Sequence, residues 1–225
     1  HIDSLDDFLA SAKDSLTVRG EDEYVDDRVN ESTEDATFLS WLSEARLVKD
    51  EFEINEMQKA IDATHRGFED MIRALPGAKG KSRGERLIEG AFFTRARYEG
   101  NDLGYDSIVA AGSHACVLHW IRNDGEVKNG DLILIDAGVE VESLYTADIT
   151  RTLPVNGKFT EAQRKIYMLV YEAQKAGFAA VKPGANFKDI TTASHEVLAK
   201  GLADLGVLPI SAEESLKPDV GLHKR

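Results

Sequence analysis

Residues 132–152 read LILIDAGVEVESLYTADITRT, and this stretch decides the fold. Its first four residues are continuously apolar, which is typical of a strand covered on both faces. We expect one strand over residues 132–139 and a second over residues 145–155. The polar segment between them predicts a hairpin with its tip near Glu142, and therefore an antiparallel pair.

Two aspartates interrupt these strands. Asp136 ends the apolar run, and Asp148 follows 12 positions later. In a hairpin of this register the two carboxylates lie side by side, and like charges placed opposite each other destabilise a sheet. A divalent cation would reverse that interaction, and two metal ions about 3.5–4 Å apart would fit between such carboxylates. Alternatively, one aspartate is a strand-end residue bonded to backbone amides. The spacing alone leaves both interpretations open.

A histidine forms the second candidate group. His119 lies in the sequence Val117-Leu-His-Trp120, inside a predicted strand over residues 115–121. An imidazole exchanges protons near neutral pH and can stabilise charge developing on an oxygen. A histidine on an apolar strand can equally be a packing residue of the core, and this alternative also stays open.

The remaining pattern predicts helices on either side of a mostly antiparallel sheet, which is an α+β domain. Apolar residues at helical spacing and turn residues set the expected bounds. We expect helices over 51–75, ended by Pro76-Gly77, and over 84–97, 161–180 with Thr160 as its cap, and 187–205, with a further strand over 105–110.

Composition narrows the function classes. The formal net charge of −13 disfavours a nucleic-acid partner and docking on anionic membranes. No apolar run is long enough to span a bilayer. The single cysteine, Cys116, cannot form a disulfide within the chain, which suits a reducing, cytoplasmic compartment. Its apolar neighbours predict a buried structural thiol, with a reactive nucleophile as the alternative.

Several segments together resemble one family. They are residues 43–54 (SEARLVKDEFEI), 104–112 (GYDSIVAAG), 118–124 (LHWIRND), 131–140 and 145–157. They are similar to the aminopeptidase P and prolidase group of metallopeptidases, over about residues 42–225. The run ADITRTLPVNG at 147–157 is highly specific, and Trp120 with Ser143-Leu-Tyr-Thr resembles the actinobacterial Xaa-Pro aminopeptidases.

The resemblance implies a pita-bread (creatinase/aminopeptidase-like) catalytic domain over residues 45–225 that is incomplete at its C-terminus. Residues 1–44 would be the end of an N-terminal creatinase-like domain, or a linker. The implied cofactors are two divalent metal ions, with Mn²⁺ expected and Co²⁺ or Zn²⁺ possible.

The resemblance also implies roles for single residues. Asp136 and Asp148 would be metal ligands, His119 would contact substrate and assist proton transfer, and Tyr105 would line the substrate site. The family's aspartates are often 11 positions apart rather than 12, and a longer hairpin tip would absorb the difference. One further histidine and two glutamates would complete the ligand set, and they would lie beyond residue 225.

The implied reaction is release of the N-terminal residue from peptides with proline at the second position. With its ligand set incomplete, this chain alone is expected to be inactive. The alternatives are an Xaa-Pro dipeptidase (prolidase), a non-catalytic pita-bread module that binds proteins, and a creatinase-like amidinohydrolase. The expected partners are proline-containing peptides, with a homo-oligomer as a possibility.

Overall fold

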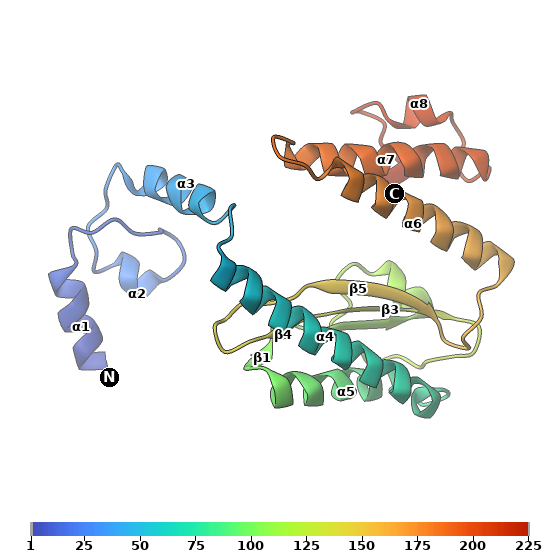
Figure 1. Ribbon diagram of the computed structural model, residues 1–225, viewed down its shortest axis with the longest axis horizontal. Coiled ribbons are helices and arrows are strands. Elements are labelled where there is room, and N and C mark those ends of the chain that lie inside the picture. The colour runs from blue at the N-terminus through green and yellow to red at the C-terminus, as the bar shows by residue number, and fades with distance from the viewer. Residues whose placement is uncertain (1, 225) are drawn as a thin grey trace. The chain divides into compact units, whose positions relative to one another are not determined.

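The computed structural model describes residues 2–224 and has the α+β architecture expected (Figure 1). Within the described residues the chain divides into two compact units. The first holds the chain up to Ile72, together with Gly90–Ser107 and Ala137–Ile149. The second holds Arg73–Glu89, Ile108–Asp136 and the chain from Thr150 onward. The predicted boundary near residue 44 stays a prediction.

The elements follow one another as helices, then strands, then helices, with two short 3₁₀ helices (η). Their bounds are α1 Ile2–Ser11, α2 Glu23–Asp26, α3 Asp35–Ala45, α4 Glu51–Ala78, α5 Gly84–Glu99, β1 Asp102–Leu103, β2 Ile108–Ala111, η1 Gly112–Cys116, β3 Leu132–Ala137, β4 Val139–Glu140, β5 Ile149–Pro154, α6 Glu161–Ala180, α7 Phe187–Asp204, α8 Ala212–Ser215 and η2 Leu222–Lys224.

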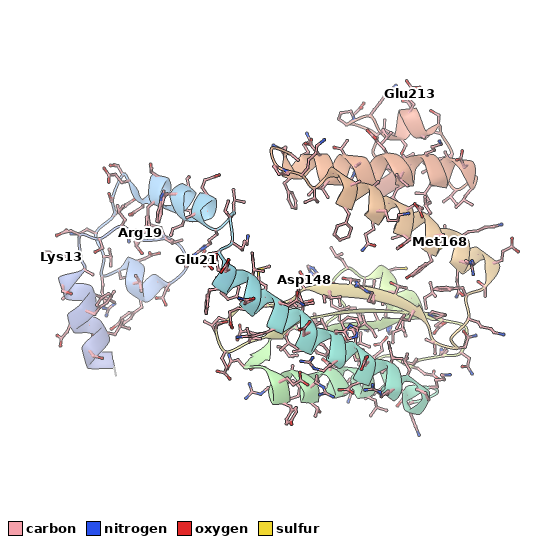
Figure 2. All side chains as sticks on the ribbon, in the orientation of Figure 1. Lys13, Arg19, Glu21, Asp148, Met168 and Glu213 are labelled. Atoms are coloured by element: carbon pink, nitrogen blue, oxygen red, sulfur yellow. The ribbon has the colours of Figure 1, made fainter. Side chains whose placement is uncertain are left out.

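The short helices α2 and α3 of the first unit are joined through one arginine. Arg19, labelled in Figure 2, forms a 3.0 Å ion pair with the buried carboxylate of Asp35. Its guanidinium also donates to the carbonyls of Asp26 and Val29, at 3.0 and 2.9 Å. Because a guanidinium carries five donors in a fixed plane, this one side chain holds residues 19–35 in place.

Helices α4 and α5 lie side by side in the first unit (Figure 1). The rings of Phe68 and Phe92 meet edge to face at 6.2 Å, and Phe92 is fully buried. Arg95 closes the exposed side of this contact with bonds to Asp70 at 2.7 Å and to Glu99 at 2.6 Å. The apolar contact excludes water, and the ion pair between Arg95 and Asp70 fixes which faces of the two helices meet.

The predicted hairpin tip near Glu142 is confirmed. The Tyr145 carbonyl accepts from Val141 N–H at 2.9 Å, and the Val139 carbonyl accepts from Ala147 N–H at 3.2 Å. On its other side β4 pairs antiparallel with β1. The N–H of Val139 donates to the Thr64 hydroxyl of α4 at 2.9 Å, so the hairpin is bonded to the helix as well as to the neighbouring strand.

The second unit holds a three-stranded sheet in the order β2-β3-β5, with β3 in the centre. β2 and β3 are antiparallel, and Asp136 faces Ile108 in the register. Along β3, Ile133 and Ile135 are buried while Leu132 and Leu134 are only half-buried. The expectation of a strand covered on both faces holds fully for one face only, because the strand alternates between a buried and a half-buried face.

Helices α6 and α7 pack against each other in the second unit (Figure 1). Both begin at a capping box, with Thr160 as the N-cap of α6 and Asn186 as the N-cap of α7. The predicted bounds of α6 and its cap are confirmed, and α7 ends one residue earlier than predicted. Polar caps satisfy the free N–H groups of a first turn, which makes such helix starts visible in a sequence.

Three local predictions were wrong. α4 continues through Pro76 to Ala78, because a proline in a last turn removes only one hydrogen bond of a helix that is already ending. Residues 115–121 form no strand but the end of η1 and a turn, since their polar groups bond elsewhere than in a sheet. Cys116 is exposed at the end of η1 and is not a buried thiol.

We predict that Gly138→Ala destabilises the hairpin strongly. A Cβ at Gly138 would lie 1.6 Å from the carbonyl oxygen of Ala147, and a backbone atom cannot move aside as a flexible side chain can. The expected loss is at least about 2 kcal/mol of unfolding free energy, within the range for overpacking. Urea unfolding followed by circular dichroism measures it.

Gly90→Ala is the matched control, because the Gly90 Cβ position in α5 has no atom within 4 Å. Alanine there should stabilise the helix by about 0.5–1 kcal/mol. Equal stability changes for the two variants would contradict the close contact at Gly138.

Candidate active site

Asp136 is the fifth residue of the central strand β3 and is half-buried. The hydroxyl of Thr150, on the neighbouring strand β5, donates to Asp136 Oδ2. The prediction that Asp136 lies near the end of an apolar strand is confirmed. A hydroxyl donor on one carboxylate oxygen fixes the orientation of the group, as is common for carboxylates that bind metal ions.

Asp148 is exposed and directly precedes β5 (Figure 2). The phenol of Tyr105 donates to Asp148 Oδ1 at 3.1 Å. The Tyr105 ring also passes close to the backbone at Gly138, where its Cε1 atom lies 3.2 Å from the position of a Cβ. Tyr105 and Asp148, which the sequence suggested as separate site residues, are therefore joined directly.

The two aspartates thus follow one pattern, a carboxylate held by a hydroxyl group. Carboxylate oxygens suit hard divalent cations such as Mn²⁺ or Mg²⁺, so the donor set fits the implied metal ions chemically. Among residues 2–224, however, no group of three or more His, Cys, Asp or Glu side chains could hold a metal ion. The role of the two aspartates as metal ligands therefore stays a prediction.

His119 lies in the turn after η1, and its side chain is exposed. Within residues 2–224 its ring has no hydrogen-bond or ion-pair partner, while its carbonyl accepts from Ile121 N–H at 3.0 Å. The alternative of a core packing residue is excluded by this exposure. An exposed imidazole held only through its backbone can meet a bound molecule.

The loop around His119 is organised by a glutamate that the sequence did not single out. Glu85, in the first turn of α5, is fully buried. Its Oε1 atom accepts from Ala111 N–H at 2.8 Å and lies 2.9 Å from His114 Nδ1. Its Oε2 atom accepts from the Trp120 indole at 2.8 Å and from Gly125 N–H at 2.7 Å.

No sequence signal marks Glu85 as different from any other acidic residue. An acidic side chain in the first turn of a helix is ordinarily exposed and interacts with the helix dipole. Only the fold shows that this one is enclosed by the residues between β2 and β3. Thr150 was missed for a similar reason, because a threonine on a strand is common and its partner depends on strand pairing.

The tip of the hairpin that leads to Asp148 is bonded to α4. The Tyr145 phenol donates to Glu53 at 2.7 Å, and the Ser143 hydroxyl donates to Glu56 at 2.7 Å. The bond from Tyr145 is the main cause that lowers the pKa of Glu53, and it also raises the pKa of Tyr145. For Glu56, the nearby Lys59 lowers the pKa first and Ser143 second.

The antiparallel pairs β2–β3 and β1–β4, with helices before and after them in the chain, form the α+β framework that carries these residues. The chain belongs to metallopeptidase family M24, whose family description matches residues 55–218. Its fold is the pita-bread fold of aminopeptidase P, as the resemblance predicted.

Three similar proteins define the relationship. The chain is 58% identical over 185 residues to Xaa-Pro aminopeptidase 1 of Streptomyces coelicolor, covering 82% of this chain and 37% of that protein. It is 50% identical over 209 residues to Xaa-Pro aminopeptidase 2 of the same organism, covering 92% and 44%. A structure of zinc-substituted Escherichia coli aminopeptidase P with product matches with a TM-score of 0.78 and 30% identity, covering 96% of this chain and 53% of that chain.

The predicted likeness to actinobacterial Xaa-Pro aminopeptidases is confirmed by the Streptomyces relatives. The chain spans less than half the length of these two relatives. Across the described residues 2–224, no helix is long and apolar enough to cross a membrane.

We predict that the Glu53–Tyr145 bond stabilises the first unit only between two pH limits. The pKa of Glu53 is lowered from 4.5, so its contribution is present above pH 4.5 and is lost as pH falls through the folded-state pKa. The pKa of Tyr145 is raised from 10.0, so its contribution is present below pH 10.0 and is lost as pH rises through the folded-state pKa.

Tyr145→Phe should therefore lower the melting temperature by a similar amount throughout the neutral range. The difference from the unmodified chain should shrink at both extremes of pH. Thermal melts at several pH values measure this. Tyr98→Phe is the control, because the Tyr98 side chain is 81% exposed on α5. A difference that stays constant down to the lowest pH would contradict the role of Glu53.

Proposed function

We propose that the protein containing this chain is an Xaa-Pro aminopeptidase that releases the N-terminal residue from peptides with proline at the second position. The observation that carries the proposal is the presence of Asp136, Asp148 and His119 together in a chain 58% identical to Xaa-Pro aminopeptidase 1. A non-catalytic module would have no need of two oriented carboxylates, and a creatinase-like hydrolase works without metal.

Asp136 and Asp148 would hold part of a site for two divalent metal ions, for which we propose Mn²⁺, with Co²⁺ or Zn²⁺ also accepted. When bound, such ions supply Lewis acidity and lower the pKa of water. The further ligands would come from sequence outside the 225 residues. This accords with the absence of a larger ligand cluster among residues 2–224.

The side chains of this chain have separate tasks in the proposed reaction. Thr150 and Tyr105 hold the two carboxylates in fixed orientations through their hydroxyl groups. Tyr105 also borders the substrate. The exposed imidazole of His119 donates a hydrogen bond to the scissile carbonyl oxygen as negative charge develops there, or passes a proton to the departing proline nitrogen.

The compartment and the substrate length belong to the same proposal. We propose the cytoplasm, since a single exposed cysteine without a disulfide partner in the chain suits a reducing environment. The proposed function is also compatible with a homo-oligomer. An Xaa-Pro dipeptidase is the alternative, and a comparison of Xaa-Pro dipeptides with longer peptides separates the two activities.

We predict that Asp148→Asn reduces kcat/KM for an Xaa-Pro peptide by at least about 100-fold in the full-length protein assayed with Mn²⁺. Loss of a ligand should exceed the effect of losing a supporting bond, which is typically 10–100-fold. Bound metal, measured on the same samples by mass spectrometry, should fall as well. The 225-residue chain by itself should show no hydrolysis.

Glu142→Gln is the matched control, because it removes an exposed carboxylate from the tip of the same hairpin. Its activity should stay within about twofold, as is usual for surface substitutions. Unchanged activity and metal content in Asp148→Asn would refute the ligand assignment, and hydrolysis by the chain alone would refute the proposed division of the site.

A further inference from the structure

Glu85 is fully buried, and among residues 2–224 His114 is the ionisable side chain that contacts its carboxylate. Its side chain is completely inaccessible to solvent, and His114 Nδ1 lies 2.9 Å away. Burying a carboxylate is costly unless it is hydrogen-bonded on several sides. Here two backbone amides, an indole and an imidazole form hydrogen bonds with the carboxylate, and all of these groups belong to one segment.

That segment is residues 111–125, and it carries His119. The donors are Ala111 at its start, His114 and Trp120 on either side of His119, and Gly125 at its end. The backbone of Glu85 adds one more bond, from its N–H to the Gly125 carbonyl at 3.2 Å. A single side chain therefore bonds to four points of this segment, while Val127 further along the chain forms a bridge with Lys79.

The link to His119 runs through the next residue, Trp120. The Trp120 indole donates to Glu85, and its ring stacks on His114 at 3.9 Å between centroids with the planes 22° apart. Gly125 completes the enclosure, since a Cβ there would come within 2.5 Å of the His114 ring and 2.7 Å of Glu85 Oε1. His119 itself has no side-chain partner within residues 2–224, so its position depends on this neighbour.

We infer that Glu85 is a positioning residue for His119, acting through the Glu85–Trp120–His114 cluster to hold the imidazole where the substrate carbonyl is bound. The inference rests on the proposed peptidase function. A misplacement of about 1 Å in a reacting group can reduce a rate about 100-fold, so a rigid anchor one residue away from His119 affects catalysis without touching substrate.

Two variants of the full-length protein test this. Glu85→Gln replaces an acceptor oxygen with an NH₂ group that faces N–H donors, and should reduce kcat by at least about 10-fold. If Glu85→Gln does not fold, Trp120→Phe decides, because it keeps an aromatic ring beside His114 while removing the indole donor to Glu85. We expect kcat of Trp120→Phe to fall about 10-fold while KM changes less than about twofold.

Ile88→Val is the stability control, since Ile88 is fully buried on the same helix and its truncation weakens packing but removes none of the bonds to the Glu85 carboxylate. Its kcat should be unchanged. In a His119→Ala background, Trp120→Phe should alter kcat by less than about twofold, because the effect passes through His119. An equal fall in both backgrounds, or no fall in either, would overturn the inference.

A spectroscopic readout separates this inference from the proposed function. In protein labelled with ¹³C at histidine Cε1, the His119 signal, assigned by its loss in His119→Ala, should shift or broaden in Trp120→Phe and stay unchanged in Ile88→Val. Absence of Xaa-Pro hydrolysis by the unmodified full-length protein would refute the function but leave this test intact. An unaltered His119 signal in Trp120→Phe would refute the positioning role.

Discussion

The contact between two stretches of bare backbone at Gly138 and Ala147 is the constraint on which the hairpin depends. Any side chain at Gly138 would meet the Ala147 carbonyl, so only glycine permits this approach. The contact pins the register of the hairpin, and a slip of one residue would turn every side chain to the other face. Asp148 directly follows Ala147, so the direction in which its carboxylate points depends on this register.

Hydrogen bonds between polar side chains fix this region further. Tyr105 and Thr150 each give a hydroxyl to one aspartate, and Glu53 accepts from Tyr145 at the hairpin tip. Each of these bonds is individually weak in a partly solvated setting. Together they fix the orientation of carboxylates that would otherwise rotate freely.

Glu85 also fixes its surroundings through hydrogen bonds, but as a fully buried carboxylate. A buried carboxylate surrounded by donors rigidifies the loop that provides them, because each unmade bond would leave a polar group without a partner. Bonds to Glu85 thereby hold the loop between β2 and β3 at His114, Trp120 and Gly125. The exposed His119 lies next to one of these points, and the position that we infer for its imidazole rests on them.

The sequence by itself determined most elements of regular structure and the family. Apolar periodicity and polar caps are local, so the helices beginning at Glu51, Gly84 and Glu161 could be predicted to within a few residues. The aspartates were visible because a charged residue in an apolar strand contradicts its surroundings. Their joint role as metal ligands stays a proposal.

The tertiary structure alone decided which ordinary residues matter. In the fold, the buried Glu85 holds a loop through its hydrogen bonds, and Cys116 is exposed. Residues 115–121 form no strand, although their apolar character favours one. The reason is physical: periodicity reports which face a residue presents, whereas hydrogen-bond partners come from segments that are distant in the chain. Only folding brings those partners together, and no local pattern encodes them.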